Sequence, residues 1–539
     1  MANVTIIVPP QIVTLTQIGS CGVPPIGASY IAGYMEKLGH TVEVIDGLGE
    51  DMYKYTKWGI SNVRGITIPE IVNRIPRDTE IIGISNMWSH AWPVTRDLTI
   101  EIKKVYPKVP IILGGVNPTS LTEQVLSYPS VDYCVLGEGE ETMRELVAAL
   151  ESGSPVKDIK GIAYRNNGNG IVINPKRERR KDLDSLPYPA YHKIPLETYI
   201  QIRQPHGAGR GRSLPIIGTR GCPFSCTFCT APKVWSKDWI TRDPSRVVDE
   251  IQYHMEKYKA DDFQFEDLTA ITDKDWIMRF SEELMRRNIK ISWQLPCGTR
   301  TETFDEEVAR TISKAGCTNI TFAPESGSVD SLRWVQKKLD LNNVYKAARY
   351  SVKAGITVCG FVVIGFPNET KEDIKNTFKM LRKLAWIGFH EVSITTFTAI
   401  PGSEIFYELL KEKKVELNDE FYVGLLCMSD LMAVTSWNSN FTDKQLARLR
   451  VRAYMNFFFF AYLFRPWRFF KSFKNVIFKR QENKLEKVVY DMLCKWRTNL
   501  KGILGIHKNR KDGGEGTLLT TSCCQPDSLM KVDGSSNRT

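Results

Sequence analysis

Three cysteines close together in the sequence have the residue type and spacing of a metal-binding loop. Cys222, Cys226 and Cys229 form the pattern C-x₃-C-x₂-C, with Phe228 directly before the last cysteine. Thiolates are the ligands that iron–sulfur clusters take from proteins, so three of them on one loop can bind three irons of a cubane. No fourth cysteine follows nearby, which would leave one iron open, and an open position is typical of catalytic rather than structural metal sites.

Two other uses of these cysteines are structural zinc and disulfides. Structural zinc needs a fourth ligand, and the nearest histidines, His206 and His254, lie well outside the loop. Disulfides need an oxidising compartment, but the twelve cysteines are mostly isolated and Met1–Pro10 reads as a buried strand, not as a secretion leader. We therefore favour the iron–sulfur cluster and expect a cytoplasmic protein.

The composition is that of a globular protein with more than one domain. With 539 residues, the chain has room for two or three domains of about 100–200 residues. The net charge of +11 is uneven, because residues 446–511 hold 17 Lys and Arg against 3 Asp and Glu. The remaining chain is near neutral, so we expect no nucleic-acid partner.

Residues 1–151 alternate short apolar runs with amphipathic helical patterns, which predicts an open, doubly wound α/β sheet. The expected strands are 4–8, 42–45, 81–85, 111–113 and 133–136, and the expected helices are 28–38, 94–105 and 140–151. Glycine and proline mark the turns after the strands, where open sheets bind ligands. Each such turn alone is weak support for a site, and their repetition in this order is stronger.

Residues 152–211 read as an ordered linker region, with a hairpin at Asn166–Gly170. The βα alternation then resumes over residues 212–415. The expected strands are 215–219, 263–266, 291–295, 320–322, 360–364 and 392–396, and the expected helices are 245–258, 274–287, 305–315, 342–354 and 371–387. Six βα units are too few for the full eightfold barrel, so we expect a partial one.

Residues 416–511 form a mainly helical segment rich in aromatic and basic residues, and residues 512–539 read as a disordered tail. Residues 454–478 contain 12 aromatic residues, with Arg465, Arg468, Lys471 and Lys474 among them. The apolar run 453–464 is shorter than the ~20 residues that span a bilayer. Two interpretations remain: a helix packed on the barrel, which we favour, or a segment lying on an anionic membrane surface at its cytoplasmic side.

The cysteine loop and its surroundings resemble the radical S-adenosylmethionine (SAM) superfamily. Residues 1–151 resemble the cobalamin-binding domain fused ahead of such domains, over stretches that include 24–28, 82–85, 113–118 and 132–140. Further matching stretches are 263–267, 324–328 and 360–369. The resemblance covers about residues 1–415 and is closest to the branch of the anaerobic magnesium-protoporphyrin ester cyclase and various C-methyltransferases. It implies an α/β fold, with a Rossmann-like cobalamin-binding domain, a partial (β/α)₆ radical SAM barrel and the helical C-terminal segment.

The resemblance implies three cofactors: a [4Fe–4S] cluster, SAM and cobalamin. The cysteines would bind the cluster, with Phe228 shielding it. The expected SAM contacts are Glu266 and Asp267 for the ammonium group, Glu325 and Ser326 for the ribose or amino group, and Gly365 for the adenine. The expected cobalamin contacts are Pro25, Gly27, Ser85, Gly114, Gly115, Gly137, Glu138 and Gly139. A cap or turn role is an equally good interpretation of each acidic residue.

His90 is a possible axial ligand, because cobalt often takes an axial imidazole. The Asp-x-His-x-x-Gly motif is absent, as in the fused radical SAM branch, and His90 is the only well-placed loop histidine in the sequence. We favour a packing or surface role for His90 over an axial ligand.

The leading hypothesis is methylation of an unreactive carbon by way of a 5′-deoxyadenosyl radical and methylcobalamin. An oxidoreductase or cyclase that uses cobalamin without methyl transfer is the first alternative, and a non-catalytic cobalamin-binding module is another. A methylthiotransferase is disfavoured, since only Cys21 and Cys134 precede the linker. The expected partners are a small-molecule or lipid-like substrate and a flavodoxin or ferredoxin as reductant.

Overall fold

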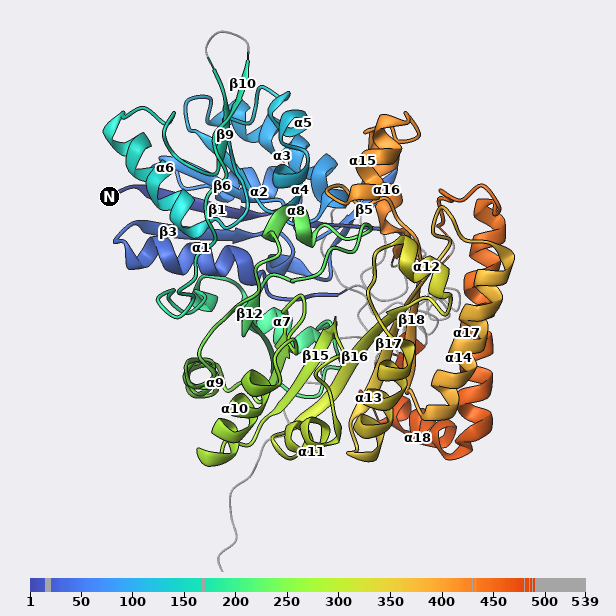
Figure 1. The fold of residues 1–539 in the computed structure, drawn as a ribbon. Helices are drawn as coiled ribbons and strands as arrows, with labels where there is room; N and C mark the ends of the chain where they lie inside the picture. Colours follow the sequence, from blue (N-terminus) through green and yellow to red (C-terminus); the bar gives the residue numbers. More distant parts are fainter. Residues whose placement is uncertain are drawn as a thin grey trace, which may run out of the picture.

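The computed structural model describes residues 1–489, apart from 15–20, 167–169 and the single positions 429, 432, 479, 484 and 487. The predicted tail, 512–539, and the end of the predicted aromatic segment lie outside these residues. Two α/β units lie one above the other, and the C-terminal helices run along one side of the lower unit (Figure 1).

The upper unit is built on a sheet of five parallel strands in the order β3-β1-β6-β7-β8. Their bounds are β1 Asn3–Val8, β3 Thr41–Asp46, β6 Ile81–Ser85, β7 Ile111–Gly114 and β8 Tyr133–Val135. Strand β1 pairs with β3 on one side and with β6 on the other, so the winding direction of the sheet reverses between β1 and β6. Such a switch point is where open α/β sheets bind ligands, at the carboxyl ends of the strands.

Helices cover both faces of this sheet, as the alternating pattern predicted. They are α1 Ile26–Lys37, α2 Ile68–Arg74, α3 Trp92–Val105, α4 Val116–Ser120, α5 Thr122–Leu126 and α6 Glu140–Ser152. Helix α3 buries Trp92, Leu98 and Ile102 on one face, at the spacing of an amphipathic helix. A small antiparallel sheet, made of β2 Gln11–Val13, β4 Tyr55–Trp58 and β5 Ser61–Arg64, lies beside it.

The sheet of the upper unit extends beyond residue 151 into the predicted linker region. Strands β9 Ile162–Arg165 and β10 Ile171–Ile173 pair antiparallel, and β9 also pairs with β8. The hairpin predicted around the Asn/Gly cluster is therefore confirmed. It covers the hydrogen-bonding edge of β8, which would otherwise remain exposed.

The lower unit is a sheet of six parallel strands in sequence order, which confirms the predicted partial barrel. The strands are β11 Ser213–Ile216, β14 Asp262–Phe265, β15 Ser292–Thr299, β16 Cys317–Glu325, β17 Thr357–Ile364 and β18 Glu391–Thr396. The helices between them are α9 Pro244–Tyr258, α10 Lys274–Arg286, α11 Glu306–Lys314, α12 Val329–Trp334, α13 Leu341–Lys353 and α14 Lys371–Ile387. A two-stranded ribbon, β12 Thr219–Arg220 and β13 Ile240–Thr241, and helix α8 Ala231–Trp235 follow β11.

The two faces of this curved sheet differ in chemistry. On the outer face, Phe265 and Trp293 pack edge-to-face on Phe280 of α10. On the inner face, Gln264 and Gln294 lie at the alternate strand positions and are fully buried.

The inner-face glutamines hold the end of the predicted linker. The Gly207 and Ala208 amides donate to the side chains of Gln264 and Gln294, over 2.6 and 3.0 Å. The stretch 206–210, which follows helix α7 Leu196–Ile202, therefore fills the inner face of the barrel rather than connecting the two units over the surface.

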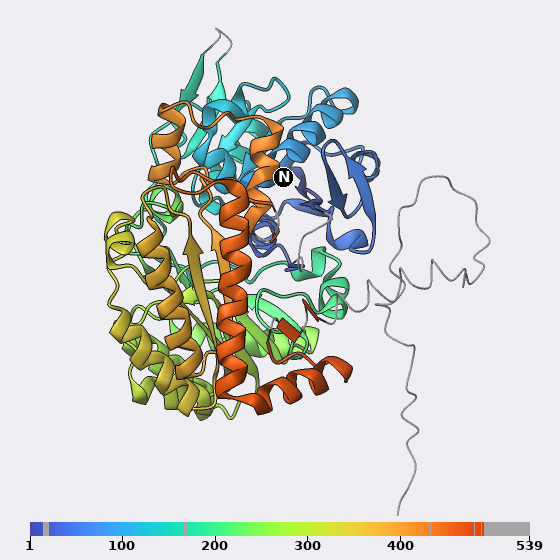
Figure 2. The same ribbon diagram turned by 90° about the vertical axis from the view of Figure 1, so that its right-hand side faces the viewer.

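Helix α15 Glu404–Lys411 ends the barrel region, and the C-terminal segment comprises α16 Asp419–Gly424, α17 Asp443–Phe464 and α18 Pro466–Ile477. Helices α15 and α16 contact the upper unit, where Tyr407 donates to the Ser120 carbonyl and Arg96 pairs with Asp419. Helix α17 runs the length of the lower unit beside α14 and β18, and α18 turns away at its lower end (Figure 2). Among the described helices, none combines the length and the apolar character needed to cross a bilayer.

Candidate active site

The cysteine loop lies beyond the carboxyl end of β11, between β12 and α8. Its first residue, Gly221, has φ +97°, and a Cβ there would lie 2.0 Å from the Asp238 carbonyl oxygen. Only glycine fits this close approach without a shift of the backbone. The loop is also tied to the barrel, since the Thr227 amide donates to the Val335 carbonyl over 3.1 Å.

The three thiols face a partly buried, electropositive environment. Burial raises the pKa of the Cys229 thiol to about 11, and it also raises the pKa values of Cys222 and Cys226. The Lys337 ammonium opposes this effect at all three thiols. The Ala231 amide donates to Cys229 Sγ over 3.5 Å. A cation and an amide donor stabilise thiolates, which are the form that binds a cluster.

The spacing of the thiols fits a cluster better than a single ion. In a tetrahedral zinc site, ligand sulfurs lie about 3.8 Å apart. Among the described residues, one triplet of His, Cys, Asp and Glu ligand atoms lies within a mutual 4.8 Å, and it is not the loop cysteines. The loop sulfurs therefore do not all lie within the distance expected around one ion, and the loop has no fourth cysteine, which is compatible with three ligands of a [4Fe–4S] cubane.

A buried ion pair lies beside this loop. Glu325, the last residue of β16, has φ +61°, in the left-handed region that non-glycine residues rarely adopt. Its Oε1 atom lies 2.8 Å from Lys337 Nζ, and both side chains are more than nine-tenths buried. A strained, charged pair next to the cysteines is typical of a functional site. The predicted contact of Glu325 with SAM stays a prediction, and in this structure Lys337 is its partner.

Ser326 and Gly365, two further residues predicted to bind SAM, both donate to Glu369, a residue that the sequence did not single out. Glu369 Oε2 accepts from the Gly365 and Phe366 amides over 2.6 and 3.2 Å, and Oε1 accepts from the Ser326 hydroxyl over 3.3 Å. Ser326 is fully buried by these contacts. Burial raises the pKa of Glu369 to about 7. Glu369 therefore fixes the backbone of the Gly365 turn, and a contact of Gly365 with the adenine stays a prediction.

The acidic pair after β14 has protein partners of its own. Asp267 is buried and accepts from the Gly218 and Thr219 amides, which fixes the turn just before the cysteine loop. Burial raises its pKa to about 7. Glu266 lies 2.5 Å from His206 Nδ1 and accepts from the Cys297 thiol. Binding of the SAM ammonium group by Glu266 and Asp267 stays a prediction.

Aromatic side chains enclose the cysteine loop. The Phe228 ring packs edge-to-face on Phe366, with centroids 5.5 Å apart, so it joins the cysteine loop to the Gly365 turn. The Arg300 guanidinium lies 3.7 Å from the centroid of the Phe224 ring. Arg300 is a second cation close to the loop that the sequence did not single out, and only its position at the carboxyl end of β15 could have suggested it.

Several residues predicted to contact cobalamin lie together at the carboxyl edge of the upper sheet. A Cβ at Gly27 or at Gly114 would meet no atom within 4 Å, and Pro25 and Ser85 lie at the same edge. At Gly115, with φ +118°, a Cβ would lie 2.6 Å from the Asn86 carbonyl oxygen. The glycines at this edge therefore differ in role, with free space beside Gly27 and Gly114 and a tight turn at Gly115, and their contact with cobalamin stays a prediction.

The loop after β6 presents a large exposed ring at this edge. Trp88 is 58% exposed, and its ring stacks on His90 with centroids 6.3 Å apart. Burial lowers the pKa of His90 to about 4, so the imidazole is neutral. The stacking on Trp88 accords with the packing role favoured for His90.

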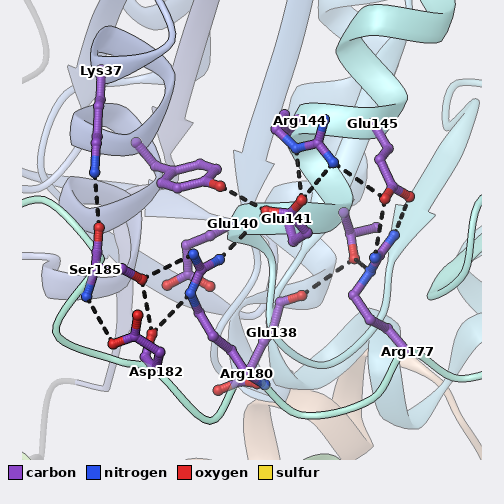
Figure 3. Close-up of polar contacts among 12 residues, drawn as sticks. Lys37, Glu138, Glu140, Glu141, Arg144, Glu145, Arg177, Arg180, Asp182 and Ser185 are labelled. Carbon is purple, nitrogen blue, oxygen red and sulfur yellow. Dashed lines mark hydrogen bonds and ion pairs between the residues drawn. The ribbon is translucent and has the colours of Figure 1, made fainter. Parts of the chain in front are cut away.

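The Gly137–Gly139 turn is fixed by charges from outside the upper sheet. Glu138 pairs with Arg179 and Arg220 at 3.1 and 3.5 Å and accepts from the Arg180 amide. Figure 3 shows Glu138, Glu140 and Glu141 facing Arg180 of the linker region. The Glu138 side chain is nine-tenths buried among these partners, and its predicted contact with cobalamin stays a prediction.

Comparisons with known proteins define the class of the chain. The B12 binding domain family matches residues 14–147, and the Radical SAM superfamily matches residues 216–381. The chain therefore belongs to the radical SAM enzymes that carry a B12-binding domain. This confirms the predicted family and its cofactors, [4Fe–4S] cluster, SAM and cobalamin, and it confirms that the protein is an enzyme.

Relatives with assigned names extend over most of the chain. An uncharacterized methyltransferase of Pyrococcus horikoshii is 28% identical over 85% of this chain and 92% of its own. The anaerobic magnesium-protoporphyrin IX monomethyl ester cyclase of Rubrivivax gelatinosus is 29% identical over 74% of this chain and 68% of its own. The radical SAM methyltransferase TsrM of Kitasatospora setae, solved with cobalamin and a [4Fe–4S] cluster, shares the fold with a TM-score of 0.61, at 16% identity over 76% of this chain and 75% of its own.

Proposed function

We propose that the protein is a cobalamin-dependent radical SAM methyltransferase that methylates an unreactive carbon of a small molecule. The single observation that supports this best is the contact between the two cofactor loops: Arg220, just before the cysteines, is bonded to Glu140 beside the Gly137–Gly139 turn, over 2.7 Å. This contact brings the predicted cluster loop next to a turn at the predicted cobalamin edge, which supports joint use of the two cofactors. The methyltransferase of Pyrococcus horikoshii supports the same reaction class.

The residues of the chain have distinct parts in this function. Cys222, Cys226 and Cys229 hold the cluster, and the Glu325–Lys337 pair binds the amino-acid end of SAM. When bound, the cluster supplies the electron that cleaves SAM, and cobalamin carries the methyl group. The protein orients these groups and excludes water. Phe228 and the backbone at Gly365 would bound the adenine.

A cyclase or oxidoreductase that uses cobalamin without methyl transfer is the second candidate, because the Rubrivivax gelatinosus relative is named a cyclase. Anaerobic reconstitution with methyl-deuterated SAM, cobalamin and a cell extract separates the two. The methyltransferase is expected to give a product heavier by one labelled methyl group. Formation of 5′-deoxyadenosine with no labelled product would contradict methyl transfer.

Iron content provides the control for that experiment. Cys226→Ala is expected to lose the cluster and all cleavage of SAM, whereas Cys317→Ala, a buried cysteine of β16, is expected to retain iron. Radical SAM chemistry also needs a reductant, and we propose a flavodoxin or ferredoxin. Cleavage of SAM with chemical dithionite but with neither protein would contradict that choice.

The described part of the C-terminal segment presents an apolar surface, defined by α17 and α18. Its members are each more than half exposed: Met455, Phe459, Leu463, Trp467, Phe469, Phe470, Phe473, Ile477 and Phe478. Monomeric proteins rarely expose so many large apolar side chains together. Between Asp443 and Glu482 the sequence has no acidic residue. We propose that this surface lies on an anionic lipid bilayer, from which a lipid-like substrate would be taken.

The basic residues of this segment divide into two groups. Arg465 and Arg468 donate to main-chain carbonyls at the end of α14 and beyond, such as those of Ala385 and Gly388, so they dock the helices on the barrel. Lys474 is exposed and available to lipid headgroups. The packing interpretation of the segment and the membrane interpretation therefore apply to different side chains.

Flotation with vesicles tests this surface. The full chain is expected to float with phosphatidylserine-containing vesicles and less with neutral ones. Phe470→Glu with Phe473→Glu is expected to abolish flotation, whereas Ile60→Glu, an equally exposed apolar residue between β4 and β5, is not. Equal flotation of all three proteins, or none by the unsubstituted chain, would contradict the membrane proposal.

A further inference from the structure

The inner face of the barrel carries three side chains of metal-ligating type that lie apart from the cysteine loop. His206 comes from the stretch before β11, Glu266 directly follows β14, and Cys297 belongs to β15. One ligand atom of each lies within 4.8 Å of the other two. Over the described residues, no other triplet of His, Cys, Asp or Glu meets this condition.

Two of the residues belong to strand ends, and the third is in a stretch that is anchored to a strand. Glu266 and Cys297 are at the carboxyl ends of adjacent parallel strands. His206 lies directly before Gly207, whose amide donates over 2.6 Å to the buried side chain of Gln264. Sites built on strands are held more closely than sites on loops. The His206 side chain keeps 31% exposure, so the group is open on one side.

The three side chains are in mutual contact and lie closer together than the ligands of one bound ion. His206 Nδ1 lies 2.5 Å from Glu266 Oε2, and Cys297 Sγ lies 3.3 Å from the same oxygen. Ligand atoms around a tetrahedral zinc ion are about 3.4–3.6 Å apart. A shift of the His206 ring by about 1 Å would therefore admit the ion. Imidazole nitrogen, thiolate sulfur and carboxylate oxygen are the three ligand types that zinc takes in proteins.

We propose that His206, Glu266 and Cys297 bind a zinc ion in the barrel, separate from the iron–sulfur cluster. Three protein ligands leave the fourth position open to water or to a substrate oxygen, which the ion would polarise as a Lewis acid. Binding displaces the thiol proton of Cys297 to solvent, His206 binds through Nδ1 as a neutral imidazole with its ring proton on Nε2, and no electrons move.

Metal analysis of a cluster-free chain tests this site without interference from the cysteine loop. The background is the full-length chain with Cys222→Ala, Cys226→Ala and Cys229→Ala, purified after growth with zinc. One zinc ion per chain is expected by mass spectrometry of the metal content. X-ray absorption at the zinc edge is expected to show one sulfur neighbour near ~2.3 Å and nitrogen or oxygen near ~2.0 Å.

Two near-isosteric variants separate metal binding from simple hydrogen bonding. His206→Gln keeps an N–H donor for Glu266 but removes the ring nitrogen, and Cys297→Ser keeps a donor but removes the sulfur. Each is expected to weaken zinc binding more than about tenfold, since outer-shell changes alone cost that much. His192→Gln is the matched control, because His192 lies 3.1 Å from Glu36 on the surface.

Absence of zinc from the cluster-free background would overturn the inference, and so would zinc that persists in both variants, because it would then be bound elsewhere. Circular dichroism of each variant checks that the chain is folded. The outcome is independent of the proposed methyl transfer, because the background has no cluster and cleaves no SAM.

Discussion

The Arg220 guanidinium donates a 2.7 Å hydrogen bond to the Glu140 carboxylate, and both side chains are more than nine-tenths buried. Arg220 ends β12, immediately before Gly221 and Cys222, while Glu140 begins α6 of the B12-binding domain. The pair therefore joins the loop that carries the cluster cysteines to a loop at the cobalamin edge. The strong pairing lowers the pKa of Glu140 despite its burial.

Removal of one partner should be costly. Arg220→Met is expected to lower the free energy of unfolding by about 3 kcal/mol, because Glu140 would remain as an uncompensated buried charge. Arg220→Met combined with Glu140→Gln should recover part of this loss. Urea unfolding of the four proteins of the double-mutant cycle measures the coupling. As a comparison, Lys375→Met, which removes an exposed pair with Glu372, should cost less than about 1 kcal/mol.

Gly221→Ala is expected to reduce the amount of cluster bound. The added Cβ would lie 2.0 Å from the Asp238 carbonyl oxygen, so the backbone beside Cys222 must move. Iron per chain and the cluster's visible absorption after anaerobic reconstitution measure the effect. Gly355→Ala is the matched control, since Gly355 has φ +83° but its Cβ would meet nothing within 4 Å. Equal iron in both variants would show that the close approach is unimportant.

Much of this arrangement was predictable from the sequence, because periodicity and turn chemistry set the elements. The predicted helix 371–387 has the bounds of α14, where Thr370 and Asp373 form a capping box. The cysteine loop was evident from ligand type and spacing alone. Among the predicted glycines, Gly115, Gly137 and Gly365 have positive φ, which few other residues adopt.

The long-range partners were not predictable. The residues around His206 carry no periodicity, and they were assigned to a linker because nothing local shows that they pair with Gln264 and Gln294 inside the barrel. Lys337 likewise lies beside the cysteines only because α12 returns the chain to the end of β16. Single-sequence patterns report local structure, whereas such contacts depend on the completed fold.

Lys337 is expected to set the reduction potential of the cluster. Its ammonium acts on all three cysteine thiols, so its loss should lower the potential by about 50 mV, equivalent to ~1 kcal/mol of Coulomb energy. The test compares the double variant Lys337→Met with Glu325→Gln against Glu325→Gln alone. The second substitution avoids an unpaired buried carboxylate when the Lys337 ammonium is removed. Redox titration followed by electron paramagnetic resonance measures it. Lys338→Met, which removes an exposed charge one residue away, should leave the potential unchanged.

Glu369 should make the protein less stable as the pH rises from about 4.5 to 7. Its pKa is about 7 in the folded protein against an ordinary 4.5, because the carboxyl is buried beside Gly365 and Ser326. The folded state therefore holds a proton that the unfolded state has released across this window, and stability falls with rising pH. A difference of about 2.5 pH units corresponds to about 3 kcal/mol, fully present below pH 4.5 and lost by pH 7.

Glu369→Gln tests this directly, because glutamine keeps an acceptor oxygen but does not titrate. Urea unfolding at pH 5 and at pH 7.5 should show a smaller decrease in stability for the variant than for the unsubstituted chain. Asp267, whose pKa burial raises to about 7, and Asp46, raised to about 6, contribute slopes of the same sign that stay in the variant. Glu372→Gln, an exposed residue on the same helix, should leave the decrease unchanged. If Glu369→Gln also leaves it unchanged, then Glu369 is ionised in the folded protein throughout this range, and another group produces the pH dependence.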